Sequence, residues 1–109
     1  MDKHLVTTGF DFQGYHITKY LGITQGIIVR INTFGGGFRA GIQALKGGNN
    51  RFYAELCEKA RSDAFDTMLQ NAEKLGANAV ISMRYDTNQL LPNITEVLAY
   101  GTAVVVEKQ

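Results

Sequence analysis

Residues 52–86, "FYAELCEKARSDAFDTMLQNAEKLGANAVISMRYD", decide the fold because a helical pattern passes into a strand pattern across one glycine. Before Gly76, apolar residues recur at intervals of three and four, which predicts a helix with one apolar face over residues 50–75. Gly76 lies where a left-handed cap is expected at the end of this helix. Residues 79–86 then alternate between two faces, which predicts a strand. The two predicted faces of this strand are Val80, Ser82 and Arg84 against Ile81, Met83 and Tyr85.

The segments on either side of this stretch predict two more strands. Residues 15–31 alternate and are rich in β-branched side chains, with expected bends at Gly22 and Gly26. Residues 94–108 alternate too, and both faces are apolar near the end, so both are expected to be covered. Residues 87–93 are expected to form a loop that joins the last two strands into an antiparallel hairpin. The predicted fold class is therefore α+β, a mostly antiparallel sheet packed against one long helix.

Composition predicts a single globular domain over residues 1–109. Apolar residues make up 45% of the chain and charged residues 19%, which is too apolar for a disordered protein. The net charge of +1 provides no basic field for nucleic acid, and no run approaches the roughly 20 apolar residues that cross a bilayer. Cys57 is the single cysteine, which excludes an internal disulfide and fits a reducing compartment. We therefore expect a soluble, cytoplasmic protein with neither nucleic acid nor a membrane as its partner.

The predicted helix indicates that the chain associates with itself. At 1.5 Å per residue, a helix over residues 50–75 is roughly 39 Å long. That length is large for a domain of 109 residues, so part of the apolar face is expected to contact a neighbouring subunit. The low charged fraction favours association as well, because few charges are left to cover the surface.

The glycine-rich stretch "NTFGGGFRAGIQALKGG", residues 32–48, has two interpretations. It matches neither the P-loop nor the dinucleotide-binding spacing. Its backbone N–H groups, with Arg39 nearby, can form a nest for an anion. Alternatively, its glycines form a bend, a short helix within residues 38–46 and an exit close to a subunit contact. We favour the second interpretation.

Metal binding and catalysis find little support in the sequence. His4, His16 and Cys57 are the strong nitrogen or sulfur ligands, and their spacing matches no metal motif. Cys57 lies on the apolar face of the predicted helix, where a buried thiol is expected. We therefore predict no catalytic residue and no metal ligand, and the sequence names no cofactor.

Arg61 is the most informative charged residue, because it lies between Ala60 and Ala64 at the edge of the apolar stripe. An arginine that is half-buried there needs a carboxylate or carbonyl partner. One interpretation is an ion pair that fixes the helix against the sheet or an adjacent subunit. The other is an arginine that binds an anion in a pocket between subunits.

Several segments, in the right order along the chain, also carry a family resemblance. They are "TKYLGITQG" (18–26), "FYAELCEKARSDAF" (52–65), "AEKLGANAVISMRYD" (72–86) and "YGTAVVVEK" (100–108). In these segments the chain resembles the YbjQ-like family of small uncharacterised proteins, which carries the label "putative heavy-metal-binding". The resemblance implies a compact α+β subunit, similar to a dodecin subunit, that assembles as a homopentameric ring.

The resemblance and the residue patterns together single out three candidate ligand-binding residues, Arg39, Tyr53 and Arg61. Tyr53 with Arg61 downstream is among the most specific parts of the resemblance. The chain departs from the family pattern at Ala54 and Asn49, which weakens the metal-binding expectation.

Three classes of function remain open. We favour a homo-oligomeric module that binds a small anion, another small ligand or a metal ion at a subunit interface. The second class is a structural or interaction protein whose pentameric ring presents a surface to a protein partner. The third is an enzyme with an interfacial active site, which the sequence favours least because no nucleophile–base pair can be named.

Overall fold

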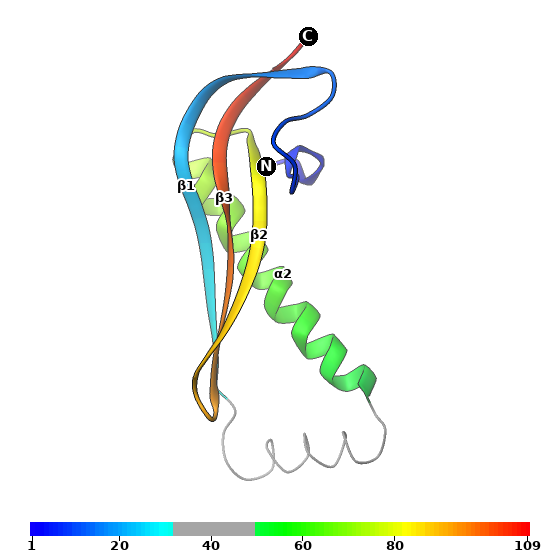
Figure 1. Ribbon diagram of the computed structural model, residues 1–109, viewed down its shortest axis with the longest axis vertical. Helices are drawn as coiled ribbons and strands as arrows, with labels where there is room; N and C mark the ends of the chain where they lie inside the picture. The colour runs from blue at the N-terminus through cyan, green and yellow to red at the C-terminus, as the bar shows by residue number, and fades with distance from the viewer. Residues whose placement is uncertain (32–49) are drawn as a thin grey trace.

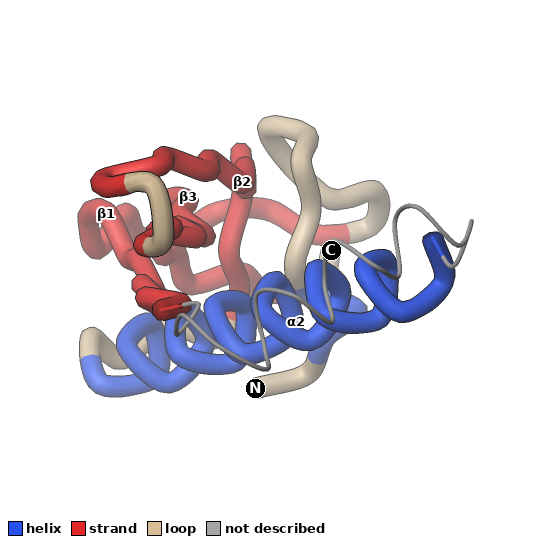
Figure 2. Tube along the Cα trace, turned by 90° about the horizontal axis from the view of Figure 1, so that it is seen from below, coloured by secondary structure: helices blue, strands red, loops and turns tan. Residues whose placement is uncertain are grey.

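The fold consists of one long helix lying across one face of a three-stranded sheet (Figures 1 and 2). This computed structural model describes residues 1–31 and 50–109, with the backbone alone for residues 50–54. The elements are the short 3-10 helix η1 (Lys3–Leu5), β1 (Tyr15–Ile31), α2 (Asn50–Lys74), β2 (Ala79–Leu91) and β3 (Ile94–Lys108). The α+β class, the antiparallel sheet and the long helix are thus confirmed. The short helix expected within residues 38–46 lies outside the described residues.

The sheet has the order β1-β3-β2, and both pairs are antiparallel. The loop expected over residues 87–93 is wrong, because β2 continues to Leu91 and only Pro92 and Asn93 form the turn. The polar residues of this segment stay in register with β3, where Thr87 lies opposite Val97 and Gln89 opposite Thr95. The hairpin is therefore longer and its turn tighter than the sequence predicted.

The helix comes closest to the sheet at Gly26 of β1. A Cβ atom at this position would collide with the backbone carbonyl oxygen of Ala64 and the backbone nitrogen of Met68. The buried hydroxyl of Thr24 donates a hydrogen bond of 2.8 Å to the Met68 carbonyl oxygen at the same contact. Small residues on this side of β1 therefore let α2 lie directly on the strand. The core beneath the helix consists of Ala60, Ala64, Met68, Leu69, Ala72, Val80, Met83, Val97, Ala99 and Ala103.

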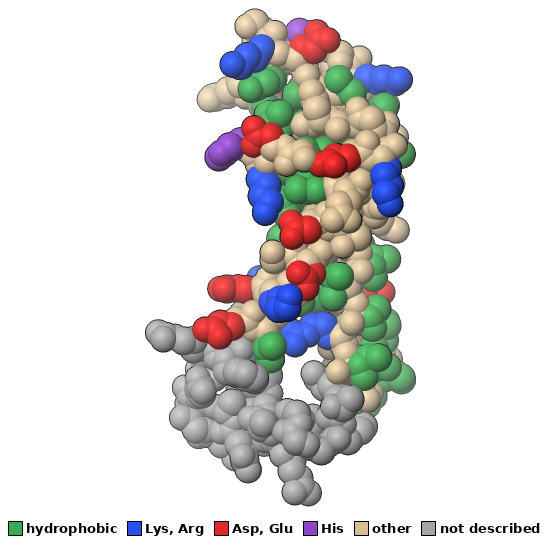
Figure 3. Space-filling view, turned by 180° about the vertical axis from the view of Figure 1, so that it is seen from behind, with side chains coloured by type: hydrophobic (Ala, Val, Ile, Leu, Met, Phe, Trp, Pro, Cys, Tyr) green, Lys and Arg blue, Asp and Glu red, His purple; other side chains and the backbone are tan. Residues whose placement is uncertain are grey.

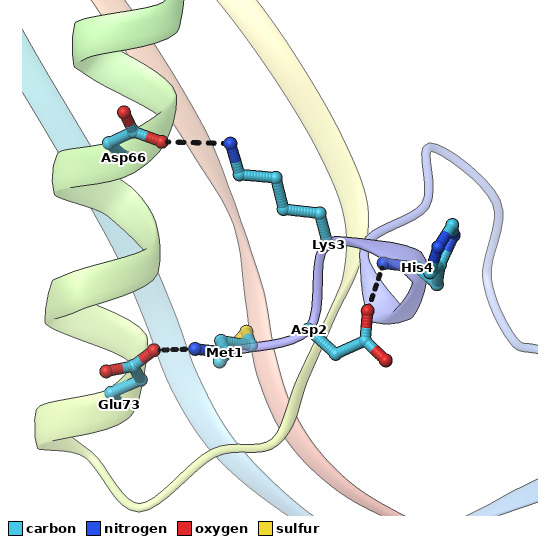
Figure 4. Close-up of polar contacts among 6 residues, drawn as sticks. All are labelled: Met1, Asp2, Lys3, His4, Asp66 and Glu73. Carbon is cyan, nitrogen blue, oxygen red and sulfur yellow. Dashed lines mark hydrogen bonds and ion pairs between the residues drawn. The ribbon is translucent and has the colours of Figure 1, made fainter.

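The opposite face of the sheet is covered at one end by the N-terminal segment. Side chains of Leu5, Phe12, Tyr15 and Ile17 pack on a second cluster formed by Ala79, Ile81, Val104 and Val106. The expectation that both faces of the last strand are covered near its end is confirmed. Ion pairs hold the segment to α2, one between the Met1 amine and Glu73 and one of 3.6 Å between Lys3 and Asp66 (Figure 4).

A bulge at Ser82 interrupts the simple alternation that the sequence predicted for β2. Ser82 has a φ of 55°, and the pairing register with β3 shifts between Ile81 and Arg84. The N-terminal segment pairs with the bulge, since the Ser82 amide donates to the Gly9 carbonyl at 2.8 Å and the Met83 amide to the Thr7 carbonyl at 3.0 Å. The bulge keeps Val80 and Met83 together in the core under the helix.

Candidate functional site

A cavity of about 210 Å³ lies between the sheet and the N-terminal half of α2. It opens because the apolar face of the helix is buried only from Ala60 onward, whereas Leu56 is half-buried and Cys57 is exposed. Figure 1 shows the same divergence, with the helix crossing the sheet obliquely and separating from it toward its N-terminus. Eight described residues line the cavity: Arg30, Leu56, Cys57, Ala60, Arg61, Thr87, Thr95 and Val97.

Arg30 enters the cavity wall from β1. The residue is half-buried, and its Nη1 donates a hydrogen bond of 2.8 Å to the backbone carbonyl oxygen of Leu56 on α2. This bond fixes the guanidinium between the strand and the helix. A guanidinium carries five N–H donors, so the bond to Leu56 leaves others for further partners.

Arg61 enters the wall from α2, and its exposure to solvent differs from the expectation. The residue is exposed rather than half-buried, and its guanidinium carbon lies 5.9 Å from the ring centroid of Tyr85 on β2. Among the ion pairs formed by described residues, none involves Arg61. Within the described part of the chain, Arg61 thus makes a cation–π contact rather than an ion pair to the sheet. An ion pair to an adjacent subunit and a contact to an anion both stay predictions.

The pKa of Tyr85 depends on this contact. Burial of the phenol raises the pKa of Tyr85 above its ordinary value of 10.0. The Arg61 charge opposes that rise in pKa, and the nearby Asp66 carboxylate adds to it. Arg61 and Tyr85 also line a shallow hollow between α2 and β2, together with Glu58, Ser62 and Phe65.

The cavity combines an apolar body with hydrogen-bond donors. Leu56, Ala60 and Val97 supply carbon surface, and Thr87 and Thr95 supply hydroxyl groups from adjacent strands. No aspartate or glutamate is among the described lining residues, so the two guanidinium groups meet no acidic side chain there. This arrangement can hold a small molecule that has an apolar part and accepts hydrogen bonds from arginine.

The structure describes less of the other candidate residues that the sequence singled out. Tyr53 lies in the first turn of α2, one turn before Cys57, and only its backbone is described. Arg39 lies outside the described residues. Cys57 is exposed in the cavity wall, so the expectation of a buried thiol is wrong, because the helix has already left the sheet at this position.

Sequence reasoning missed Arg30 altogether. The residue follows Thr24, Gly26 and Ile28 on the less apolar face of β1, which does not resemble a core face. The available signal is the pair of small residues Thr24 and Gly26 on that face, because they permit the close approach of α2. An arginine that continues this face toward the end of the strand points to the place where the two elements separate.

The described residues do not fit a metal ion. No group of three or more histidine, cysteine, aspartate or glutamate side chains comes together in residues 1–31 and 55–109. His16 lies 3.8 Å from Glu107 on β3, whereas Cys57 lies in the cavity wall beside two arginines. Positive guanidinium groups beside a single thiol disfavour a cation.

The fold places the chain in the class of small α+β proteins in which one long helix crosses a three-stranded antiparallel sheet. The chain belongs to the YbjQ family, whose model is described as "Putative heavy-metal-binding" and matches residues 4–107. It is 52% identical to a UPF0145 protein from Solibacter usitatus over 101 residues, covering 93% of this chain and 90% of the relative. A UPF0145 protein from Burkholderia thailandensis is 48% identical over 103 residues, covering 94% and 93% of the two chains.

A solved structure confirms the fold independently. It is a protein of unknown function of the DUF74 family from Pediococcus pentosaceus, with a TM-score of 0.64 and 16% sequence identity. The match covers 94% of this chain and 96% of that chain. Within the described residues, no helix combines the length and apolar character needed to span a membrane.

Proposed function

We propose that this protein is a homo-oligomeric binding module that holds a small ligand in the cavity between α2 and the sheet. The observation that carries this proposal is the presence of Arg30 and Arg61 in one largely apolar cavity. One guanidinium is fixed by a helix carbonyl and the other lies against an aromatic ring, so both are held near the cavity without a carboxylate partner among the described residues. Two guanidinium groups in one cavity wall attract an anionic ligand.

Self-association is supported by a bare apolar surface, which we call the outer sheet face. It lies opposite the helix. Its apolar side chains among the described residues are those of Ile23, Ile27, Val29 and Ile31 of β1 with the half-buried Leu98 and the exposed Tyr100 of β3, and Gln25 and Glu96 lie between them. Ile23 is 75% exposed and Ile31 is 62% exposed. Figure 3 shows hydrophobic side chains gathered on the lower right side of the part drawn in colour. Several exposed large apolar side chains on one face are typical of an interface.

The shape of the chain supports the same conclusion. The radius of gyration is 17.1 Å, whereas a compact domain of about 100 residues has one of about 13 Å. The chain extends over 53 × 24 × 17 Å, so a large share of its apolar surface is left at the periphery. β1 also stands at the edge of the sheet, where its free backbone groups can pair with another strand.

A homopentameric ring is the assembly that the family resemblance implies, and it is part of this proposal. The ligand-binding roles of Arg39 and Tyr53 stay predictions, as does the cytoplasmic location, which rests on the single cysteine and the composition. We favour a small anion over a metal ion as the ligand, because the cavity presents guanidinium groups rather than a set of metal ligands.

Native mass spectrometry and thermal unfolding test the binding proposal. We expect one class of small molecules to add its mass to the purified assembly and to raise the unfolding temperature. The Arg30→Gln variant should lose both effects, whereas Lys19→Gln, which removes an exposed charge from the same strand, should keep them. If anions, neutral compounds and metal ions all leave the unfolding temperature and the mass unchanged, the binding proposal is wrong.

The alternative is a structural or interaction protein whose pentameric ring presents a surface to a protein partner. The exposed side chains of Leu90 and Leu91, close to the hairpin turn, favour it. This alternative predicts that a Leu90→Ser, Leu91→Ser variant keeps its assembly and its ligand response but loses a partner in pull-down experiments.

A further inference from the structure

We propose that the ligand of this cavity is a small organic monocarboxylate with an apolar body. This inference rests on the proposed binding function and adds the chemical class of the ligand. It follows from the side chains that meet in the cavity wall, namely two guanidinium groups, two hydroxyl groups and carbon surface.

The charge of the wall selects an anion. Arg30 and Arg61 approach the cavity from β1 and from α2, and no acidic side chain is among the described lining residues. Arg30 is the better anchor, because its bond to the Leu56 carbonyl fixes the planar guanidinium before any ligand arrives. A carboxylate matches a guanidinium in shape and can accept two parallel N–H bonds from it.

The rest of the wall selects an apolar body rather than a fully polar ion. Leu56, Ala60 and Val97 offer carbon surface to whatever fills the cavity. A phosphate or sulfate ion would leave this surface in contact with water, whereas an alkyl or aromatic group removes it from water. Thr87 and Thr95 can hydrogen-bond a second oxygen of the ligand.

The size of the cavity limits the ligand. A volume of about 210 Å³ exceeds the roughly 150 Å³ of an engineered apolar cavity that binds benzene. A six-carbon chain with one carboxylate therefore fits, whereas a dinucleotide does not. Hexanoate is a suitable probe, and hexanol and hexylamine are matched probes of similar size with neutral and positive head groups.

Cys57 provides a readout at the site itself. Its thiol is exposed, it lines the cavity, and it is the single cysteine of the chain. The rate at which iodoacetamide alkylates Cys57 in the intact assembly therefore reports whether the cavity is occupied. The unfolding temperature measured with the same probes gives a second, independent readout.

Hexanoate should slow the alkylation of Cys57 and raise the unfolding temperature, with hexanol weaker and hexylamine without effect. Arg30→Gln should weaken hexanoate binding by about tenfold, because it removes a charge-assisted hydrogen bond. Arg30→Lys should lose much of the affinity as well, since an ammonium group cannot form the parallel pair of bonds. Lys19→Gln is the matched control, and circular dichroism excludes unfolding of each variant.

The outcomes separate this inference from the proposed function. If hexanol or hexylamine protects Cys57 as well as hexanoate does, the cavity binds ligands but the carboxylate assignment is wrong. If hexanoate protects equally well in Arg30→Gln and in the unchanged protein, the assignment is also wrong. If no probe protects Cys57 and none raises the unfolding temperature, the binding function falls together with the carboxylate assignment.

Discussion

The two ends of the molecule differ in how completely one chain covers its own apolar surface. At the closed end, around residues 64–83 and 103–108, the sheet is covered by α2 on one face and by the N-terminal segment on the other. At the open end, around residues 27–31, 55–61 and 85–98, the helix separates from the sheet and the outer sheet face is bare. Among the described residues, the closed end covers its own apolar surface, whereas the open end leaves apolar surface exposed.

The motifs of the family resemblance belong mostly to the closed end, where they have structural roles. Gly76 ends the helix with a φ of 91°. The Asn78 side-chain amide donates to the Val106 carbonyl at 2.9 Å and accepts from the Val106 amide at 2.8 Å, as a paired strand residue would. At Gly101, a Cβ atom would lie 2.7 Å from Val80 Cγ1, so this glycine makes room for the bulge. These three motif residues therefore have structural roles, whereas the proposed ligand contacts of Arg30 and Arg61 lie at the open end.

Gly26→Val should have the largest effect on stability, because it breaks the contact between β1 and α2 on which the closed end depends. The new side chain collides with backbone atoms of Ala64 and Met68, which cannot move without displacing the helix. We expect a loss of about 3 kcal/mol in the free energy of unfolding. Chemical denaturation measures it. Gly9→Val, at an exposed glycine whose nearest neighbour is a flexible hydroxyl, should cost far less, and equal losses at the two positions would contradict the proposed helix contact.

The next effect should come from Ile27→Glu, which places a charge in the outer sheet face. Because a buried, unpartnered carboxylate is costly, the assembly should dissociate into smaller species. Sedimentation velocity and circular dichroism measure assembly and secondary structure separately. Gln70→Glu adds the same charge to an exposed site on α2 and should leave the assembly intact. An unchanged assembly in Ile27→Glu would show that the outer sheet face is not an interface.

A smaller effect is expected for Asn78→Ala at the closed end. The substitution leaves the amide and carbonyl of Val106 without their side-chain partners. The free energy of unfolding should fall by about 2 kcal/mol, which thermal or chemical denaturation can measure. Asn88→Ala removes the same side chain from an exposed position of β2 and serves as the control. Equal effects at positions 78 and 88 would argue against the strand-like pairing of Asn78.

The smallest effect concerns the ionisation of Tyr85 at the open end. Its raised pKa means that ionisation opposes folding, so the stabilising contribution is complete below pH 10.0 and is lost as the pH rises through the folded pKa. Arg61→Gln removes the charge that lowers this pKa and should raise the pKa of Tyr85 further. Tyrosinate absorbance measures the shift, and Tyr85→Phe identifies this residue among the five tyrosines. A fall in the pKa of Tyr85 would contradict the Arg61 contact.

The sequence predicts the helix and the strands better than it predicts where they end and which segments they contact. The helix and the three strands follow from periodicity, because each has a buried face. The true turn at Pro92 and Asn93 was obscured by Thr87, Asn88 and Gln89, which are exposed in a strand although polar residues resemble a loop. No glycine marks the position of the bulge in the sequence. A serine can occupy it because backbone hydrogen bonds with the N-terminal segment stabilise the bulge.

The candidate site could be predicted only in part. Arg61 was found because it borders the apolar stripe of the helix, but its exposure follows from the divergence of α2 from the sheet. Arg30 was missed because its role depends on a contact with Leu56, which lies 26 residues away in the chain. Spacing within one element does not reveal a contact between two elements.

The most direct test of the central claim, that other copies of the chain complete the open end, is sedimentation velocity of the unchanged protein at micromolar concentration. We expect one dominant species with a mass several times that of a single chain, and five copies if the ring is a pentamer. A stable, fully folded monomer under these conditions would contradict it.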